Sequence, residues 1–168
     1  MNASAFPKPS LRPFLAADLP LLSEIRFAAI DELTVDDYDE AQRRAWASTV
    51  DDDEEFAQSL AKGLTLVALI GGGPVGFISL QDGGLIDQLY VHPSVARIGV
   101  ASALVEAIEK LAAARGVATL VTDASDTAKP LFEARGYQGI HRNTIEIEGE
   151  YFGNTRMTKA LAPKVVPR

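Results

Sequence analysis

The first third of the chain carries apolar residues at helical spacing. Between residues 19 and 33 they recur every three or four positions, which predicts an amphipathic helix over that range. Residues 39–48 are predicted to form a second helix. A third is predicted over 51–62, where Asp51 and Glu54 have the spacing of a capping pair at the helix start. We therefore expect this part of the chain to be mostly helical.

The pattern then changes to short runs rich in Val, Ile, Leu and aromatic residues. These runs cover residues 64–70, 75–81 and 85–92. The segments between them, 71–74 and 82–84, contain glycines and are short enough to be hairpin turns. The sequence therefore predicts a meander of three antiparallel strands.

Helices and strands alternate in the second half. A stripe of apolar residues predicts an amphipathic helix over 99–115, followed by a buried strand over 118–122. A short helix is predicted over 127–135, and a last pair of strands over 137–148 and 151–161. The prediction is an α/β fold whose mixed, mostly antiparallel sheet of about seven strands has helices on both faces.

Length and composition favour one compact domain. The chain has 168 residues, of which 47% are apolar and 23% charged, as in ordinary globular proteins. Residues 10–14 add a short extended segment at the start of this domain, which we place over residues 1–162. Residues 163–168 are predicted to be a C-terminal tail. Without an apolar run long enough for a membrane span, we expect a cytoplasmic protein that does not bind membranes.

Charge and cysteine content narrow the chemistry. The formal net charge is -7, which argues against nucleic acid as a partner because phosphates require a basic surface. Eleven Asp and Glu residues lie between Asp31 and Glu55. They are either solvated helix ends or a negative surface that attracts a protonated amine. The absence of cysteine excludes disulfides, thiolate metal sites and cysteine nucleophiles.

The segment 85–104 is predicted to be a strand, a short loop and the start of a helix. The first N–H groups of a helix have no internal acceptor and lie at the positive end of the helix dipole, so they can hold a pyrophosphate. Gly99 and Ala101 have no bulky side chain that would keep phosphates away from the backbone. Arg97 could add a positive charge. The turn is therefore a candidate anion site.

Residues 85–115 resemble the acetyl-CoA-binding motif of the GCN5-related N-acetyltransferase (GNAT) superfamily. The family pattern is Gln or Arg, two residues, Gly, one residue, then Gly or Ala, and here it covers residues 96–101. Gly99 and Ala101 agree with this pattern, whereas Ala96 replaces its first polar residue. The resemblance implies acetyl-CoA as cosubstrate and no metal. The cofactor-binding residues that it implies in this region are Leu89, Tyr90, Val91, Arg97, Ile98, Gly99, Val100, Ala101 and Ser102.

Residues 126–137 resemble the second signature of the same family, in which a short helix ends in an aromatic-Glu-x-x-Gly-aromatic run. This resemblance adds Asp126, Pro130, Phe132 and Arg135 to the expected cofactor site. The runs 89–93, 142–144 and 154–157 are similar to those of a YafP-like bacterial subgroup. The resemblance covers nearly the whole chain and implies a sheet that splays apart between its fourth and fifth strands.

The resemblance also implies a mechanism, in which an amine attacks the thioester directly in a ternary complex. A protonated amine cannot attack, and Asp87 is our candidate for the base because strand alternation places it on a face with Leu85, Leu89 and Val91. The alternative is a structural hydrogen bond. The amides near Leu89 and Tyr90 would polarise the thioester carbonyl, which gives Tyr90 a catalytic role through its backbone.

Phe132 occupies the position where relatives carry a tyrosine that protonates the leaving thiolate. Ser125, Tyr137 or water could replace that tyrosine. Solvent is the simplest donor, because a thiol has a pKa near 8.5 and leaves readily.

The acceptor is expected between the first two helices. Glu32, Tyr38 and Trp46 are the candidate substrate-binding residues, since aromatic rings and carboxylates suit an alkylammonium group. Alternatively, Tyr38 and Trp46 only pack the second helix onto the sheet. His92 and His141 have no partners at metal-ligand spacing.

The predicted function is N-acetyl transfer to a small or peptide amine. Two alternatives stay open, a non-catalytic acetyl-CoA sensor and a protein-interaction module. Edge strands near residues 151–157 leave a homodimer open as well.

Overall fold

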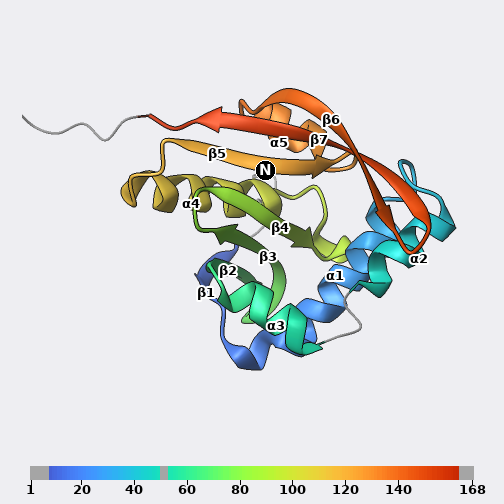
Figure 1. The fold of residues 1–168 in the computed structure, drawn as a ribbon. Helices are drawn as coiled ribbons and strands as arrows, with labels where there is room; N and C mark the ends of the chain where they lie inside the picture. The colour runs from blue at the N-terminus through green and yellow to red at the C-terminus, as the bar shows by residue number, and fades with distance from the viewer. Residues whose placement is uncertain (1–7, 50–52, 163–168) are drawn as a thin grey trace, which may run out of the picture.

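The structure is a computed structural model that describes residues 8–49 and 53–162 (Figure 1). Within them, seven strands form one sheet in the order β1-β2-β3-β4-β5-β7-β6. The strands are β1 (Ser10–Pro13), β2 (Leu64–Ile70), β3 (Gly73–Gln81), β4 (Leu85–Val91), β5 (Thr119–Ser125), β6 (Gln138–Ile147) and β7 (Glu150–Ala160). The helices are α1 (Leu19–Leu33), α2 (Glu40–Ser48), α3 (Asp53–Ala61), α4 (Val100–Ala114) and α5 (Lys129–Ala134), with short 3-10 turns at Ala16–Asp18 and Pro93–Val95.

The sheet changes direction once, in its middle. Neighbouring strands are antiparallel except β4 and β5, which are parallel. In the described ranges these two strands pair only at Leu85 with Val121 and at Ile86 with Thr122, near the start of each. Beyond Ile86 they separate, as Figure 1 shows where β4 and β5 run apart. The splay between the fourth and fifth strands, which the resemblance of the sequence implied, is therefore present.

Helices cover both faces of the sheet. On one face, α1 and α3 pack against β2 and β3 around Leu22, Phe56 and Phe77. On the other face, α4 presents its apolar stripe, including Leu104 and Ile108, to a larger cluster that also contains residues of α5 and most strands. Both clusters are apolar and buried, so they fix the angle at which the helix ends meet the open middle of the sheet.

Local sequence explains where several elements begin and end. Pro20 stands in the first turn of α1, where its missing N–H costs nothing. Asp39 caps α2 by accepting a hydrogen bond from the Gln42 amide, and Gln42 bonds back to the Asp39 amide. In the β2–β3 turn, Gly71 and Gly72 take the positive φ angles that a tight turn requires.

The predicted α/β architecture is confirmed. Its helices and strands lie within a few residues of their expected positions, and the sheet is mixed and mostly antiparallel with helices on both faces. The capping role proposed for Asp51 and the tail 163–168 lie outside the described residues. No helix in the part of the chain that the structure describes is long and apolar enough to cross a membrane.

Candidate active site

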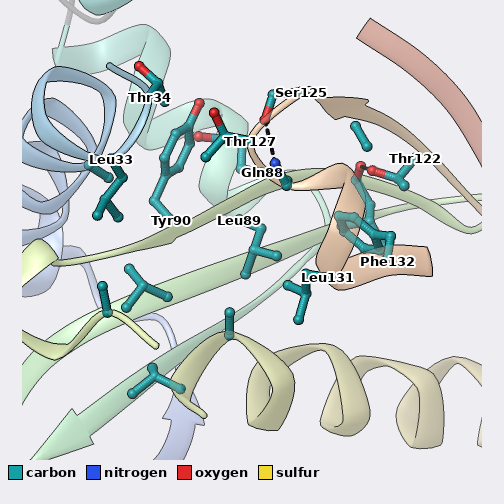
Figure 2. Close-up of a pocket in the computed structure, with 18 of the residues that line it drawn as sticks. Leu33, Thr34, Gln88, Leu89, Tyr90, Thr122, Ser125, Thr127, Leu131 and Phe132 are labelled. Atoms are coloured by element: carbon teal, nitrogen blue, oxygen red, sulfur yellow. Dashed lines mark hydrogen bonds between the residues drawn. The ribbon is translucent and has the colours of Figure 1, made fainter. Parts of the chain in front are cut away.

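The separation of β4 and β5 opens a cavity of about 380 Å³. Its walls come from the C-terminal end of α1, from Trp46 in α2, from residues 86–91 of β4, from the turn into α4, and from β5 and α5. Figure 2 shows Tyr90, Leu33 and Thr34 on one side and Thr122, Leu131 and Phe132 on the other. The cavity therefore runs through the sheet from the side of α1 and α2 to the side of α4 and α5.

A bulge in β4 forms one edge of this cavity. Gln88 lies opposite Ser79 of β3, but Ile86 lies opposite Leu80, so Asp87 has no partner in the register. Because of the bulge, the predicted alternation of side chains along β4 is wrong at its start. Ile86, and not Leu85, lies in the apolar cluster with Leu89 and Val91. Asp87 is exposed, borders the cavity and accepts a hydrogen bond of 3.1 Å from Gln81 Nε2.

The bulge also leaves main-chain groups of β4 facing the opening. The His92 amide donates to Val75 O of β3 at 2.8 Å. Hydrogen-bonded pairs alternate along an antiparallel ladder, so the amide of Tyr90 also faces β3, and those of Leu89 and Val91 face away from it. The latter two amides therefore point to the side on which β5 has separated.

The N-terminus of α4 provides a second set of main-chain donors without acceptors inside the helix. The hydrogen bond that opens the helix runs from the Ala103 amide to Gly99 O at 3.0 Å, so the amides of residues 99–102 precede the helical ladder. Gly99 has φ 94°, and no described atom lies within 4 Å of the place where a Cβ would stand. Arg97 also has positive φ, is exposed and lines the cavity. This end of the helix can hold an anion without displacing a side chain.

Two carboxylates line the cavity among the described residues, and their surroundings differ. Asp123 of β5 accepts two hydrogen bonds from Arg156, at 2.9 and 3.0 Å, and a third from Asn143. The Arg156 guanidinium holds the pKa of Asp123 below its usual value. Asp87 has one neutral donor, Gln81. Asp87 is therefore the cavity carboxylate that lacks a cationic partner within the described ranges, and the one available to take a proton.

Phe132 lines the cavity, as Figure 2 shows, and is buried against the ring of Tyr137. Ser125 and Tyr137 were the side chains considered as substitutes for a tyrosine at this position. The Ser125 hydroxyl borders the cavity and accepts a hydrogen bond of 3.1 Å from the Ala128 amide. Tyr137 does not border it. Its hydroxyl donates to Glu109, and burial and the charge of Glu109 raise its pKa.

Four residues predicted for the cofactor site lie outside the cavity lining: Ile98, Asp126, Pro130 and Arg135. Ile98 packs against the large apolar cluster. Asp126 forms an ion pair with Arg142, and the hydrogen bonds and the charge of Arg142 lower the pKa of Asp126. Arg135 donates to Glu109 of α4 at 2.7 Å, so it supports the helix from behind. The other predicted cofactor residues all border the cavity: Leu89, Tyr90, Val91, Arg97, Gly99, Val100, Ala101, Ser102 and Phe132.

Glu109 anchors α4 to the last strands. It is buried and accepts hydrogen bonds from Arg135, Tyr137 and Lys159. Burial raises the pKa of Glu109, but the hydrogen bonds from Arg135 and Lys159 outweigh burial and hold it below its usual value. α4 is therefore held by ionic contacts that the sequence motifs did not reveal.

The predicted acceptor residues do not all reach the cavity. Trp46 lines it, whereas Glu32 is exposed on α1 outside the lining. Tyr38 also lies outside the lining. Its buried hydroxyl donates to Gly153 O and accepts from the Asp126 amide, both at 2.9 Å, as expected of a residue that packs α2 onto the sheet.

Sequence reasoning missed Leu33, Thr34, Thr127 and Asp123 as cavity residues. Leu33 is the last residue of α1 and Thr34 caps it. Their place at a helix end close to the expected splay of the sheet could have predicted that they line the cavity. Asp123 directly follows the buried strand predicted over 118–122, and a charged residue at that place was the available signal. In the described ranges, no cluster of three or more His, Asp or Glu side chains is placed to bind a metal ion.

Known proteins with similar sequences belong to one family. A model of the acetyltransferase (GNAT) domain matches residues 34–161. The uncharacterized N-acetyltransferase YafP of Escherichia coli (strain K12) is 36% identical over 147 residues, which make up 88% of this chain and 93% of that protein.

Solved structures agree. A GCN5-related N-acetyltransferase from Rhodopseudomonas palustris, described as an aminotransferase, class II, is 47% identical, with TM-score 0.91, over 95% of this chain and 100% of that one. The PaiA N-acetyltransferase of Thermoplasma acidophilum in complex with coenzyme A has TM-score 0.76 at 15% identity, over 92% of this chain and 99% of that one. The latter shares the fold.

Proposed function

The chain belongs to the GNAT family of acetyl-CoA-dependent N-acetyltransferases, and on that premise we propose that it acetylates a primary amine by direct attack, with Asp87 as the base. The bulge at Asp87 carries the proposal. It places the one unpaired carboxylate of the described cavity beside strand amides that have no partner across the opening.

The donor would bind on the side of α4. The free amides at Gly99, Val100 and Ala101 suit the diphosphate of acetyl-CoA, since a helix N-terminus attracts anions. The pantetheine arm would then follow β4 through the gap between the strands. The thioester carbonyl would accept a hydrogen bond from the Leu89 amide, which stabilises the negative charge that develops on that oxygen.

The proton balance then requires one base. An alkylammonium acceptor with a pKa near 10.4 must lose a proton before its nitrogen attacks the thioester carbon. Asp87 takes that proton, directly or through water, before the C–N bond forms. After attack the nitrogen carries a second proton that an amide does not keep, and this proton passes to solvent water as the C–S bond breaks. The thiolate leaves and takes a proton from solvent. Phe132 has no hydroxyl to donate, and a thiolate with a pKa near 8.5 needs none.

The test is release of coenzyme A thiol from acetyl-CoA with a panel of monoamines, polyamines, aminoglycosides, amino acids and short peptides. We expect thiol release that depends on the amine and an acetylated product in equal amount by mass spectrometry. A non-catalytic sensor would bind acetyl-CoA in calorimetry and release no thiol with any acceptor. An interaction module would show no binding at millimolar acetyl-CoA.

A further inference from the structure

The wall of the cavity on the side of α1 and α2 is apolar. We call it the acceptor wall, and it consists of Ala29, Ile30, Leu33, Trp46 and the ring of Tyr90. Among the described lining residues, the charged side chains are Asp87, Asp123 and Arg97, and none of them belongs to this wall. An acceptor whose amine lies at Asp87 therefore has an uncharged surface beside the rest of its body.

Two hydroxyl groups next to the acceptor wall, those of Thr34 and Thr127, are already bonded. Thr34 Oγ1 donates to the Ile30 carbonyl of its own helix. Thr127 Oγ1 donates to Asp37 Oδ2 at 2.7 Å. Each hydroxyl already donates its one proton, so neither can donate to a substrate. The hydroxyl oxygen can still accept a hydrogen bond, but only weakly. Figure 2 shows Thr34 and Thr127 beside Tyr90, at the margin of this wall.

A buried positive charge lies behind the wall. Arg26 of α1 is 7% exposed, and its guanidinium carbon is 5.4 Å from the centroid of the Tyr90 ring. Its hydrogen-bond partners are neutral, Thr49 Oγ1 at 2.7 Å and the Trp46 carbonyl, and it has no carboxylate partner within residues 8–49 and 53–162. Because burial weakens screening, this charge disfavours a second cation against the wall. The Tyr90 ring is already engaged by a cation on one face.

We infer that the acceptor is a monoamine whose body is uncharged and apolar, of the size of an aryl or short alkyl group, and that diamines and polyamines are poor substrates. The inference rests on the proposed function and deepens it. It differs from the expectation that aromatic rings and carboxylates gather around an alkylammonium group. Of the carboxylates on α1, α2 and the loop between them, none belongs to the described lining, and Asp37 is bonded to the hydroxyl of Thr127.

The test compares amines that differ in one charge. Pentylamine and 1,5-diaminopentane have the same chain length, and 2-phenylethylamine tests the aromatic body. We expect kcat/KM for pentylamine and 2-phenylethylamine to exceed that for 1,5-diaminopentane by about tenfold or more. Equal values, or a preference for the diamine, would overturn the inference.

A matched pair of variants sharpens the test. Leu33→Glu adds a carboxylate to the acceptor wall, whereas Leu33→Gln has nearly the same shape and no charge. We expect Leu33→Glu to reverse the preference toward 1,5-diaminopentane and Leu33→Gln to keep the wild-type order. If both variants behave alike, the wall does not select by charge. Leu33 is half-buried at a helix end, so both variants should fold, which circular dichroism would check.

A failure of the proposed function can be distinguished from a failure of this inference. If no amine releases thiol, that function fails. The affinity of pentylamine and 1,5-diaminopentane for the complex with coenzyme A, measured by calorimetry, still decides the inference. Tighter binding of the diamine would overturn it, and tighter binding of the monoamine would support it.

Discussion

The two sides of the cavity are built in different ways. On the side of α4, the groups that can bind a ligand are main-chain amides, placed by a helix start and a strand edge. On the side of α1 and α2, the wall consists of side chains brought together from distant parts of the sequence, such as Leu33, Trp46 and Tyr90. A site made of backbone depends on local geometry and tolerates few changes of shape. A site made of side chains can change its ligand by substitution while the fold stays the same.

Asp87 lies where the two sides meet, so its substitution should affect chemistry and leave the binding of the donor unchanged. We expect Asp87→Asn to lower kcat by about 1,000-fold, because the amide cannot accept the proton of the ammonium group. The Asn side chain keeps an oxygen for Gln81, so the bulge should persist. Steady-state thiol release measures kcat, and calorimetry with coenzyme A serves as the control for donor binding. Wild-type turnover in this variant would remove Asp87 from the mechanism.

Gly99 tests the backbone-built side alone. We expect Gly99→Asp to weaken coenzyme A binding by roughly 100-fold, because a carboxylate would lie beside the diphosphate. Gly99→Asn is the matched control, since Asn has the same shape, no charge and a similar tolerance of positive φ. Both residues are good helix caps, so the fold should be kept. Calorimetric titration gives the two dissociation constants, and similar weakening in both variants would show that shape rather than charge is responsible.

Tyr38 tests how the side-chain-built side is held in place. We expect Tyr38→Phe to lower the free energy of unfolding by about 2 kcal/mol, since it leaves the Gly153 carbonyl and the Asp126 amide without their buried partner. Urea denaturation measures this change, and kcat/KM for the best acceptor should stay near the wild-type value. A large rise in KM with unchanged stability would return Tyr38 to the acceptor site.

The same contrast explains how far the sequence could be interpreted. The elements followed from local periodicity, glycine turns and caps, and the strand-turn-helix motif around Gly99 lies in one short segment. Its residues could therefore be predicted together, and most of them border the cavity. The acceptor wall depends on how α1 and α2 lie over the open sheet, which no local pattern encodes. Trp46 was anticipated as a cavity residue and Leu33 was not.

Two physical details were outside the reach of pattern analysis. Strict alternation along β4 misplaced its side chains, because a bulge inserts one residue without any sequence signal such as glycine. An aromatic residue in an acidic loop suggested ligand binding at Tyr38, but two main-chain groups use its hydroxyl. Tyr38 is needed there because two buried main-chain groups require a hydrogen-bond partner. This requirement can be recognised only once the fold brings those distant segments together.

The extra residue at Asp87 makes the number of residues in β4 as important as their identity. Removing residue 87 would let Gln88 follow Ile86 in an unbroken register with β3. The pairs on either side, Ile86 with Leu80 and Gln88 with Ser79, would keep their partners and their faces, but β4 would lose the bend that the extra residue gives it. We expect β4 then to run straighter beside β5, so that deletion of one amino acid, with every other residue retained, would narrow the open middle of the sheet.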